Sequence, residues 1–178
     1  MLVVAFTGNK GSGKTIAADY LVRKYGFVKV NFKDAIVIEL LEKFPELLNV
    51  VRSGYMLDKI EDLFNTKPYV PEIRALFREY GTNVMREMEP GYWVNKWEEM
   101  IDMIEGNQVV VDDCRFINEF NIIKRYSGTV IRIVRPCTNN DSDRHPSELE
   151  MDKIKPDHTI YNKDTISNFL GKVERKMK

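Results

Sequence analysis

The chain has 178 residues, of which 43% are hydrophobic and 30% charged, as is ordinary for one globular domain with a substantial core. Basic and acidic residues both number 27, so the formal net charge is zero, which argues against a general binder of nucleic acid or anionic membranes. Cys114 and Cys137 have no CxxC spacing, and no apolar run reaches the roughly 18 residues of a membrane helix, so we expect a cytoplasmic protein with reduced thiols.

The first part of the chain predicts a strand, a helix and a second strand. The apolar run at 2–6 is typical of a parallel strand buried on both faces, and apolar residues then recur at helical spacing up to Tyr25. Residues 27–32 (FVKVNF) predict the second strand. From 33 to 106 the pattern is helical in pieces, at 34–48, 55–65, 73–88 and 93–104. This stretch is predicted to be an insertion.

The remaining residues return to alternating strands and helices. QVVVDD at 108–113 predicts a third buried strand, a helix follows near 116–126, and TVIRIV at 129–134 predicts a fourth strand. A polar loop at 136–148 precedes a short strand at 158–162 and a closing helix. Strands that alternate with helices indicate a parallel α/β sheet of about five strands. We expect a core of about 1–32 and 107–178, with a helical insertion of about 33–106.

GNKGSGKT at 8–15 is a complete G-x-x-x-x-G-K-[ST] phosphate loop, and it lies after a predicted strand and before a predicted helix. The glycines let successive N–H groups turn toward phosphate oxygens, Lys14 would span the β- and γ-phosphates of ATP, and the Thr15 hydroxyl would bind Mg²⁺. The fold class is therefore a P-loop NTPase of three α/β/α layers. The expected nucleotide ligands here are Gly8, Asn9, Lys10, Gly11, Ser12, Gly13, Lys14 and Thr15.

Two acids end the third predicted strand. Asp112 or Asp113 is expected to bind Mg²⁺, directly or through water, because a carboxylate at this place in a P-loop sheet complements the loop. Neighbouring strand residues point to opposite faces, so the sequence leaves open which of the two serves.

Arginines are the next signal. A kinase that acts on a phosphorylated acceptor brings two polyanions together, and each like-charge pair at about 4 Å costs roughly 4 kcal/mol at an effective dielectric of about 20. Arginine suits such a site because its planar fork grips phosphate with two hydrogen bonds. Arg115 and Arg135 follow strands whose carboxyl ends bind ligands in α/β sheets. The other candidates are Arg74, Arg78 and Arg86 in the insertion, and Arg132 and Arg144 around the polar loop.

The polar segment 136–148 is a candidate lid, since phosphoryl transfer to anything but water requires that water be excluded. Of the aromatic residues in the insertion, Trp93 is a possible base-stacking residue, although aromatics at helical spacing usually belong to a core.

These pieces together resemble the phage-type deoxynucleoside monophosphate kinases, P-loop kinases related to dephospho-coenzyme A kinase. The matching segments run in order over nearly the whole chain. They are GNKGSGKT (8–15), RALFREYGTNVMR (74–86) with YW (92–93), VVVDDCRFINEF (109–120), GTVIRIVRP (128–136), RHPSE (144–148) and DHTIYN (157–162).

The resemblance implies transfer of the ATP γ-phosphate to a deoxynucleoside 5′-monophosphate with Mg²⁺. It implies catalytic roles for Lys14, Asp113, Arg115 and Arg135, and places Asn162 and Thr165 beside the adenine. Arg78 stands where the family pattern usually has Gln, a position that would read the base. The acceptor is expected to contact Asp34, Arg74, Arg78, Gly81, Thr82, Arg86, Trp93, Arg115 and Glu119.

Two alternatives stay open. A dephospho-coenzyme A kinase, or another small-molecule kinase with a hydroxyl acceptor, would use Asp34 as a base. A P-loop ATPase switch acting on a protein or DNA would hydrolyse ATP without an acceptor. The leading hypothesis is a nucleoside monophosphate kinase with a small-molecule substrate, acting as a monomer or homodimer without nucleic-acid or membrane partners.

Overall fold

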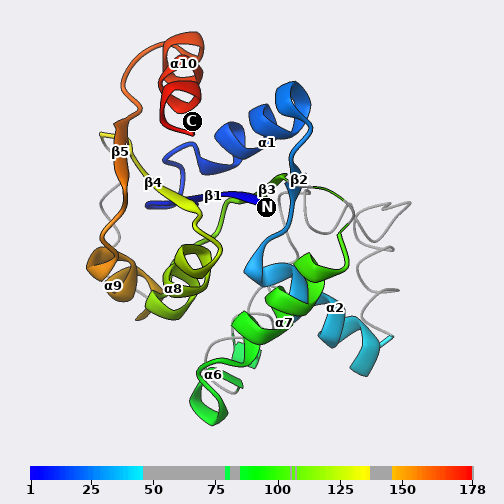
Figure 1. The fold of residues 1–178 in the computed structure, drawn as a ribbon. Helices are drawn as coiled ribbons and strands as arrows, with labels where there is room; N and C mark the ends of the chain where they lie inside the picture. The colour runs from blue at the N-terminus through cyan, green and yellow to red at the C-terminus, as the bar shows by residue number, and fades with distance from the viewer. Residues whose placement is uncertain (46–78, 81–84, 105, 107, 137–145, 178) are drawn as a thin grey trace. The chain divides into compact units, whose positions relative to one another are not determined.

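The computed structural model describes residues 1–45, 79–80, 85–104, 106, 108–136 and 146–177 (Figure 1). The chain divides into two compact units, one formed by Met1–Phe32 with Met100–Lys178 and one by Lys33–Glu99. Each unit is described by itself. The predicted helix at 55–65, most of that at 73–88 and most of the candidate lid lie outside the described residues.

The first unit is built on a five-stranded sheet with the order β2-β3-β1-β4-β5, and the neighbouring strands are parallel. The predicted parallel α/β fold is therefore confirmed. The phosphate loop follows β1, the central strand, so that it emerges between the ends of β3 and β4. The strands are β1 (Leu2–Thr7), β2 (Val28–Lys29), β3 (Gln108–Val111), β4 (Thr129–Val134) and β5 (His158–Tyr161).

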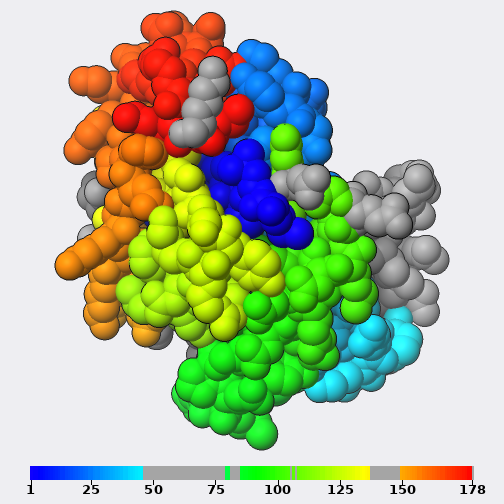
Figure 2. All heavy atoms as spheres, in the orientation of Figure 1, coloured from blue at the N-terminus to red at the C-terminus, as the bar shows by residue number. Residues whose placement is uncertain are grey.

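Helices cover both faces of this sheet (Figure 1). Alternate side chains of the central strands pack with α1 and α10 in one buried cluster, to which Phe6, Leu21 and Phe169 contribute. Figure 2 shows the side chains of α1 and α10 meeting at the surface of the unit. On the opposite face, α8 packs against β1 and β4. The helices of this unit are α1 (Lys14–Tyr25), α8 (Ile117–Arg125), α9 (Pro146–Lys153) and α10 (Ile166–Lys176).

Two strands are shorter than their sequence pattern predicts. In β2, the ladder ends soon after Lys29, because Val30 N–H still donates to Val110 O but the Asn31 side chain accepts from Asp112 N–H. β3 ends at Val111, so both acids lie beyond the ladder. The prediction also lacks α9, since the segment from Pro146 to Lys153 has a weak apolar pattern.

The second unit contains α2 from Lys33 onward, α6 and the greater part of α7. Its buried side chains include Leu40 on α2 and Val94 on α7, together with both tryptophans of the chain, Trp93 and Trp97. Among the described residues, no helix combines the length and the apolar character that crossing a membrane demands. The bounds are α2 (Phe32–Lys43), α6 (Met85–Met88) and α7 (Tyr92–Asp102).

Candidate functional site

The phosphate loop takes a backbone path that requires glycine. Gly8, Gly11 and Gly13 have φ values of 136°, 79° and 113°, in the region that L side chains rarely adopt. At Gly8 a Cβ atom would lie 2.2 Å from the carbonyl oxygen of Ile133, on the neighbouring strand β4. The loop can therefore pass this close to the sheet only because residue 8 has no side chain.

The Lys14 side chain bonds to main-chain carbonyls of the phosphate loop. Its Nζ donates to Gly8 O at 2.6 Å and to Asn9 O at 2.8 Å, and the residue is only 8% exposed although it carries a charge. A second contact across the loop joins Ser12 N–H to Asn9 O at 3.1 Å. The ammonium is thus held at the centre of the loop.

The loop fits a polyphosphate. The first N–H groups of α1 have no acceptor within the helix, and they lie beside the Lys14 ammonium at a helix N-terminus, which favours anions. Ser12 Oγ is buried and has no hydrogen-bond partner among the described residues, so it offers a further polar atom facing Gly8. Lys10 and Thr15 are exposed at the rim.

The two acids after β3 differ in their surroundings. Val110 belongs to the core beneath α1, and Asp112, two residues on, is predicted by strand alternation to face the same side; it is only 5% exposed. Asp113 Oδ1 instead accepts the main-chain N–H of Phe32 at 3.1 Å, at the start of α2. The geometry therefore gives the two neighbours different environments.

Glu119 stabilises the start of its own helix. Its Oε2 accepts the N–H of Arg115 at 2.7 Å and that of Phe116 at 3.1 Å, and Glu119 is only 2% exposed. A carboxylate at a helix N-terminus satisfies N–H groups that lack acceptors within the helix. The structure thus favours a positioning role for Glu119, next to Arg115, over the expected direct contact with the acceptor.

The two arginines of β4 and its end have different environments. The Arg132 guanidinium donates to Met151 O at 2.6 Å and to Ile154 O at 2.9 Å, carbonyls at the C-terminal end of α9. Arg135, one residue after β4, is exposed. Arg132 therefore supports the fold, whereas Arg135 remains accessible at the end of the sheet where the phosphate loop emerges.

The segment between β5 and α10 reaches the phosphate loop. Asn162 Nδ2 donates to Ser12 O at 2.8 Å, while Asn162 N–H donates to Val134 O at 2.8 Å. Thr165 is the N-cap residue of α10, where its Oγ1 accepts the N–H of Asn168 at 3.4 Å. Asn162 therefore contacts the phosphate loop, whereas the contact of both residues with the adenine stays a prediction.

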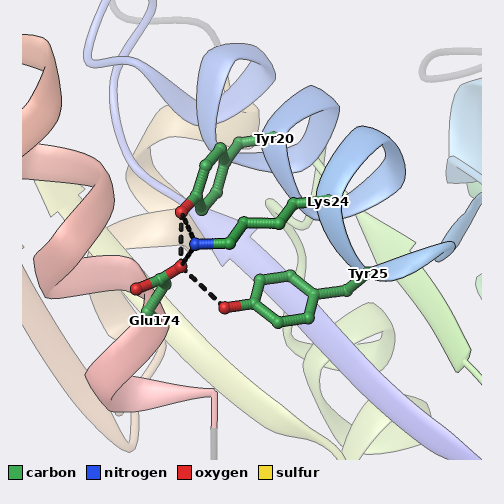
Figure 3. A network of polar contacts seen from close by, with 4 residues as sticks. All are labelled: Tyr20, Lys24, Tyr25 and Glu174. Carbon is green, nitrogen blue, oxygen red and sulfur yellow. Dashed lines mark hydrogen bonds and ion pairs between the residues drawn. The ribbon is translucent and has the colours of Figure 1, made fainter.

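A polar cluster holds α1 against α10 (Figure 3). Glu174 Oε1 accepts hydrogen bonds from Lys24, Tyr20 and Tyr25, the last at 2.6 Å. These bonds, that from Lys24 first, lower the pKa of Glu174 to about 2. The same contact with Glu174 raises the pKa of Lys24 above its ordinary value. The cluster joins the helix that begins in the phosphate loop to the helix that follows Thr165.

The expected acceptor residues that are described in the second unit are Asp34, Arg86 and Trp93. Asp34 lies in the first turn of α2 and is 9% exposed, and Arg86 lies on α6. Trp93 is fully buried and packs edge-on against Tyr80 and Tyr92, which favours a place in the interior over the expected contact with a base. Arg74, Arg78, Gly81, Thr82 and Arg144 lie outside the described residues.

Sequence reasoning missed one polar centre in this unit. Glu39, only 8% exposed, accepts from Lys43 at 2.6 Å and from Tyr80 at 2.6 Å through Oε1, and from Tyr92 at 2.5 Å through Oε2. Its four-residue spacing from Lys43 predicts only an exposed helical ion pair. The tyrosine contacts come from residues 41 and 53 positions away, which no local pattern reveals.

Comparisons with known proteins identify related sequences and similar structures. The model of the family "Deoxynucleotide monophosphate kinase" matches residues 48–173. A relative from Acanthamoeba polyphaga mimivirus, named "Putative deoxynucleotide monophosphate kinase", is 31% identical over 97% of this chain and 94% of its own. "Uncharacterized protein ORF77" of Ictalurid herpesvirus 1 is 27% identical over 96% of this chain and 68% of its own.

Among solved structures, TT1252 from Thermus thermophilus has a TM-score of 0.52 and 15% identity, and covers 98% of this chain and 95% of its own. Shikimate kinase from Bacteroides thetaiotaomicron has a TM-score of 0.50 and 16% identity, with the same two coverages. At these identities the likeness shows the fold alone. The phosphate loop, the parallel sheet and the family match over most of the sequence lead to one conclusion: the chain is a phosphotransferase that belongs to the deoxynucleotide monophosphate kinase family.

Proposed function

We propose that this protein transfers the γ-phosphate of ATP, as its Mg²⁺ complex, to a deoxynucleoside 5′-monophosphate. The observation that carries the proposal is the phosphate loop closed around the buried Lys14 in a chain of this family. Bound Mg²⁺·ATP supplies the phosphoryl group and neutralises part of its charge. The chain's own residues bind, orient and neutralise the two substrates, and a monophosphate oxygen needs little help to act as a nucleophile.

The loop residues 8–15 would hold the donor. The N–H groups at the start of α1 and the Lys14 ammonium would contact the phosphate oxygens, and the Thr15 hydroxyl would bind the metal. Asn162 and Thr165 would lie beside the adenine. The position of the loop after β1 and the contact of Asn162 with Ser12 support these assignments.

Asp112 is the better candidate for the magnesium carboxylate. Continued strand alternation would place it on the same side as Val110, which packs in the core with α1, whereas Asp113 already accepts a main-chain N–H at the start of α2. Magnesium in kinases is usually held by one or two carboxylates together with substrate phosphates, so a single buried Asp beside the loop is sufficient.

The acceptor phosphate would lie between Arg115 and Arg135. These residues follow β3 and β4, the two strands that flank β1 in the sheet, so arginines lie on both sides of the strand that leads into the phosphate loop. Such fixed cations offset the repulsion between the two phosphate groups, about 4 kcal/mol for each like-charge pair at about 4 Å and an effective dielectric of about 20.

An acceptor panel tests this function. ADP formation is measured with Mg²⁺·ATP and each deoxynucleoside and ribonucleoside monophosphate, with dephospho-coenzyme A, and without any acceptor. We expect at least one deoxynucleoside monophosphate to stimulate ADP formation strongly. Phosphorylation of dephospho-coenzyme A with all monophosphates inert would refute the proposal, as would ATP hydrolysis that no acceptor increases.

Single-residue variants, with one control, test the roles of individual side chains in the same assay. Arg115→Ala should reduce use of the acceptor while ADP still binds, whereas Arg125→Ala, an exposed arginine at the end of α8, should leave both unchanged. Lys14→Ala should abolish turnover with every acceptor, because it removes the cation at the centre of the loop.

A further inference from the structure

Asn162 contacts the main chain of the phosphate loop. This contact suggests a role in positioning the loop, in addition to the proposed contact with the adenine. Its Nδ2 donates to the carbonyl oxygen of Ser12 at 2.8 Å. Ser12 itself is only 1% exposed, so its carbonyl has little access to water as an alternative donor. The amide of Asn162 thus satisfies a main-chain acceptor in the middle of the loop.

The direction of this bond matters for the loop. In a planar trans peptide the C=O and the N–H point in opposite directions. Because Asn162 holds the Ser12 carbonyl on its own side, the N–H of Gly13 in the same peptide is turned the other way. The bond from Asn162 thereby fixes the orientation of the Ser12–Gly13 peptide. The N–H of this peptide is one of the loop N–H groups that are expected to face phosphate oxygens.

The backbone around Asn162 is itself held in place by hydrogen bonds. Its own N–H donates to Val134 O, the last residue of β4, at 2.8 Å, so its backbone is attached to the sheet. Residues on either side of Asn162 are bonded to α10 as well: Lys172 donates to the carbonyl oxygen of Tyr161, the preceding residue, at 3.3 Å, and it also contacts Asp164, two residues after Asn162. The side chain therefore transmits the position of the sheet and of α10 to the loop.

The fit at Gly13 supports the same conclusion. A Cβ atom on Gly13 would lie 2.7 Å from Asn162 Nδ2 and 3.4 Å from the ring of Phe169, and the φ of Gly13 is 113°. The Asn162 amide and the Phe169 ring thus pack directly against the residue that precedes α1. Absence of a side chain at residue 13 allows the Asn162 amide to approach the loop backbone.

We propose that Asn162 is a positioning residue that sets the Ser12–Gly13 peptide for phosphate binding, and that through it the segment beside the adenine is coupled to the phosphate loop. This inference rests on the proposed function, because it assumes that the loop binds the donor nucleotide. It predicts that Asn162 affects ligands that have no base at all.

The test therefore uses the two halves of the donor separately. Calorimetry measures the affinity of the full chain for Mg²⁺·tripolyphosphate, which lacks a base, and for adenosine, which lacks phosphate. Asn162→Ala should weaken tripolyphosphate about tenfold, as expected for one net hydrogen bond, and leave adenosine within about twofold. Asn162→Asp should weaken tripolyphosphate further, because it places an acceptor and a charge against the Ser12 carbonyl. Lys163→Ala, a substitution at the exposed next residue, is the matched control and should change neither affinity.

The opposite pattern would overturn the inference: unchanged tripolyphosphate affinity with weakened adenosine would make Asn162 a base contact only. If the variants fail to fold, NMR of the wild-type protein tests the coupling instead. Adenosine binding should then shift the amide resonance of Gly13. A Gly13 resonance that does not move would refute the coupling. These binding measurements involve no acceptor and no turnover. An inactive acceptor panel would therefore refute the proposed function while leaving the tripolyphosphate and adenosine ratios measurable.

Discussion

The carboxylate of Glu39 should contribute strongly to the stability of the second unit. It is 8% exposed and accepts hydrogen bonds from Lys43, Tyr80 and Tyr92. A hydrogen bond to a charged group contributes about 1.5–3 kcal/mol, but the Lys43 side chain is 49% exposed, so that pair adds well under 1 kcal/mol. With water partly replacing the lost tyrosine bonds, Glu39→Ala should cost about 3 kcal/mol of the free energy of unfolding.

The chain offers a direct assay for this loss. Both tryptophans, Trp93 and Trp97, lie in the same unit as Glu39, so tryptophan fluorescence during urea unfolding reports on that unit. A loss of about 3 kcal/mol corresponds to a fall of about 6–12 °C in melting temperature for a protein of this size. Glu39→Gln keeps an acceptor and the size of the side chain and should lose less than half as much. Lys43→Met should lose less than about 1 kcal/mol.

The pH dependence gives an independent check. Burial of Glu39 opposes its ionisation, but hydrogen bonds from Lys43, Tyr80 and Tyr92 outweigh burial and lower its pKa below the ordinary 4.5. The stabilisation by Glu39 is therefore complete above about pH 4.5 and is lost as pH falls through the lower pKa of the folded state. A loss below about 1 kcal/mol for Glu39→Ala at pH 7, or an equal loss for Lys43→Met, would refute this reasoning.

Other substitutions test the first unit. Asp112→Asn should abolish Mg²⁺-dependent turnover, whereas Asp113→Asn should keep most of it, because an amide oxygen can still accept the N–H at the start of α2; equal loss in a Mg²⁺ titration would contradict the assignment. Gly8→Ala should lose ADP affinity and melt lower, since its Cβ would lie 2.2 Å from a main-chain oxygen; wild-type ADP affinity would show that the loop can move away. The pKa of Glu174 is about 2, held down mainly by Lys24, so its stabilisation is present above about pH 4.5 and is lost as pH falls toward 2. The difference in melting temperature between wild type and Glu174→Gln should shrink over that range, and a constant difference would argue against it.

The sequence predicts best what is local. The phosphate loop and the strand at 129–134 are continuous patterns, and the structure contains both: the loop between a strand and a helix, and the strand with the predicted bounds. The ends of β2 and β3 are harder to predict from the sequence. There, the Asn31 side chain and the start of α2 form hydrogen bonds in place of those between the strands. That competition depends on two segments about 80 residues apart, which a local pattern does not contain.

The site illustrates the same limit. Arg132 and Arg135 are equivalent in charge and lie three residues apart, yet one is bonded to the carbonyls of α9 and the other is exposed. Glu119 matches a family segment, but its carboxylate is satisfied by two N–H groups of its own helix start. Residue type shows that a side chain can bind phosphate or substrate, whereas only the packed structure shows whether that side chain is buried in the protein or exposed to solvent.

The strand order also has a consequence for synthesis of the chain. The central strand β1 is made first, but its parallel partners start at Gln108 and Thr129, beyond the whole of the second unit. Until those residues leave the ribosome, the apolar run 2–6 has no strand to pair with on either edge. Late pairing of this kind makes folding slow and exposes an aggregation-prone segment in the nascent protein. The same arrangement that sets the phosphate loop at the centre of the sheet therefore leaves its central strand unpaired for longest during synthesis.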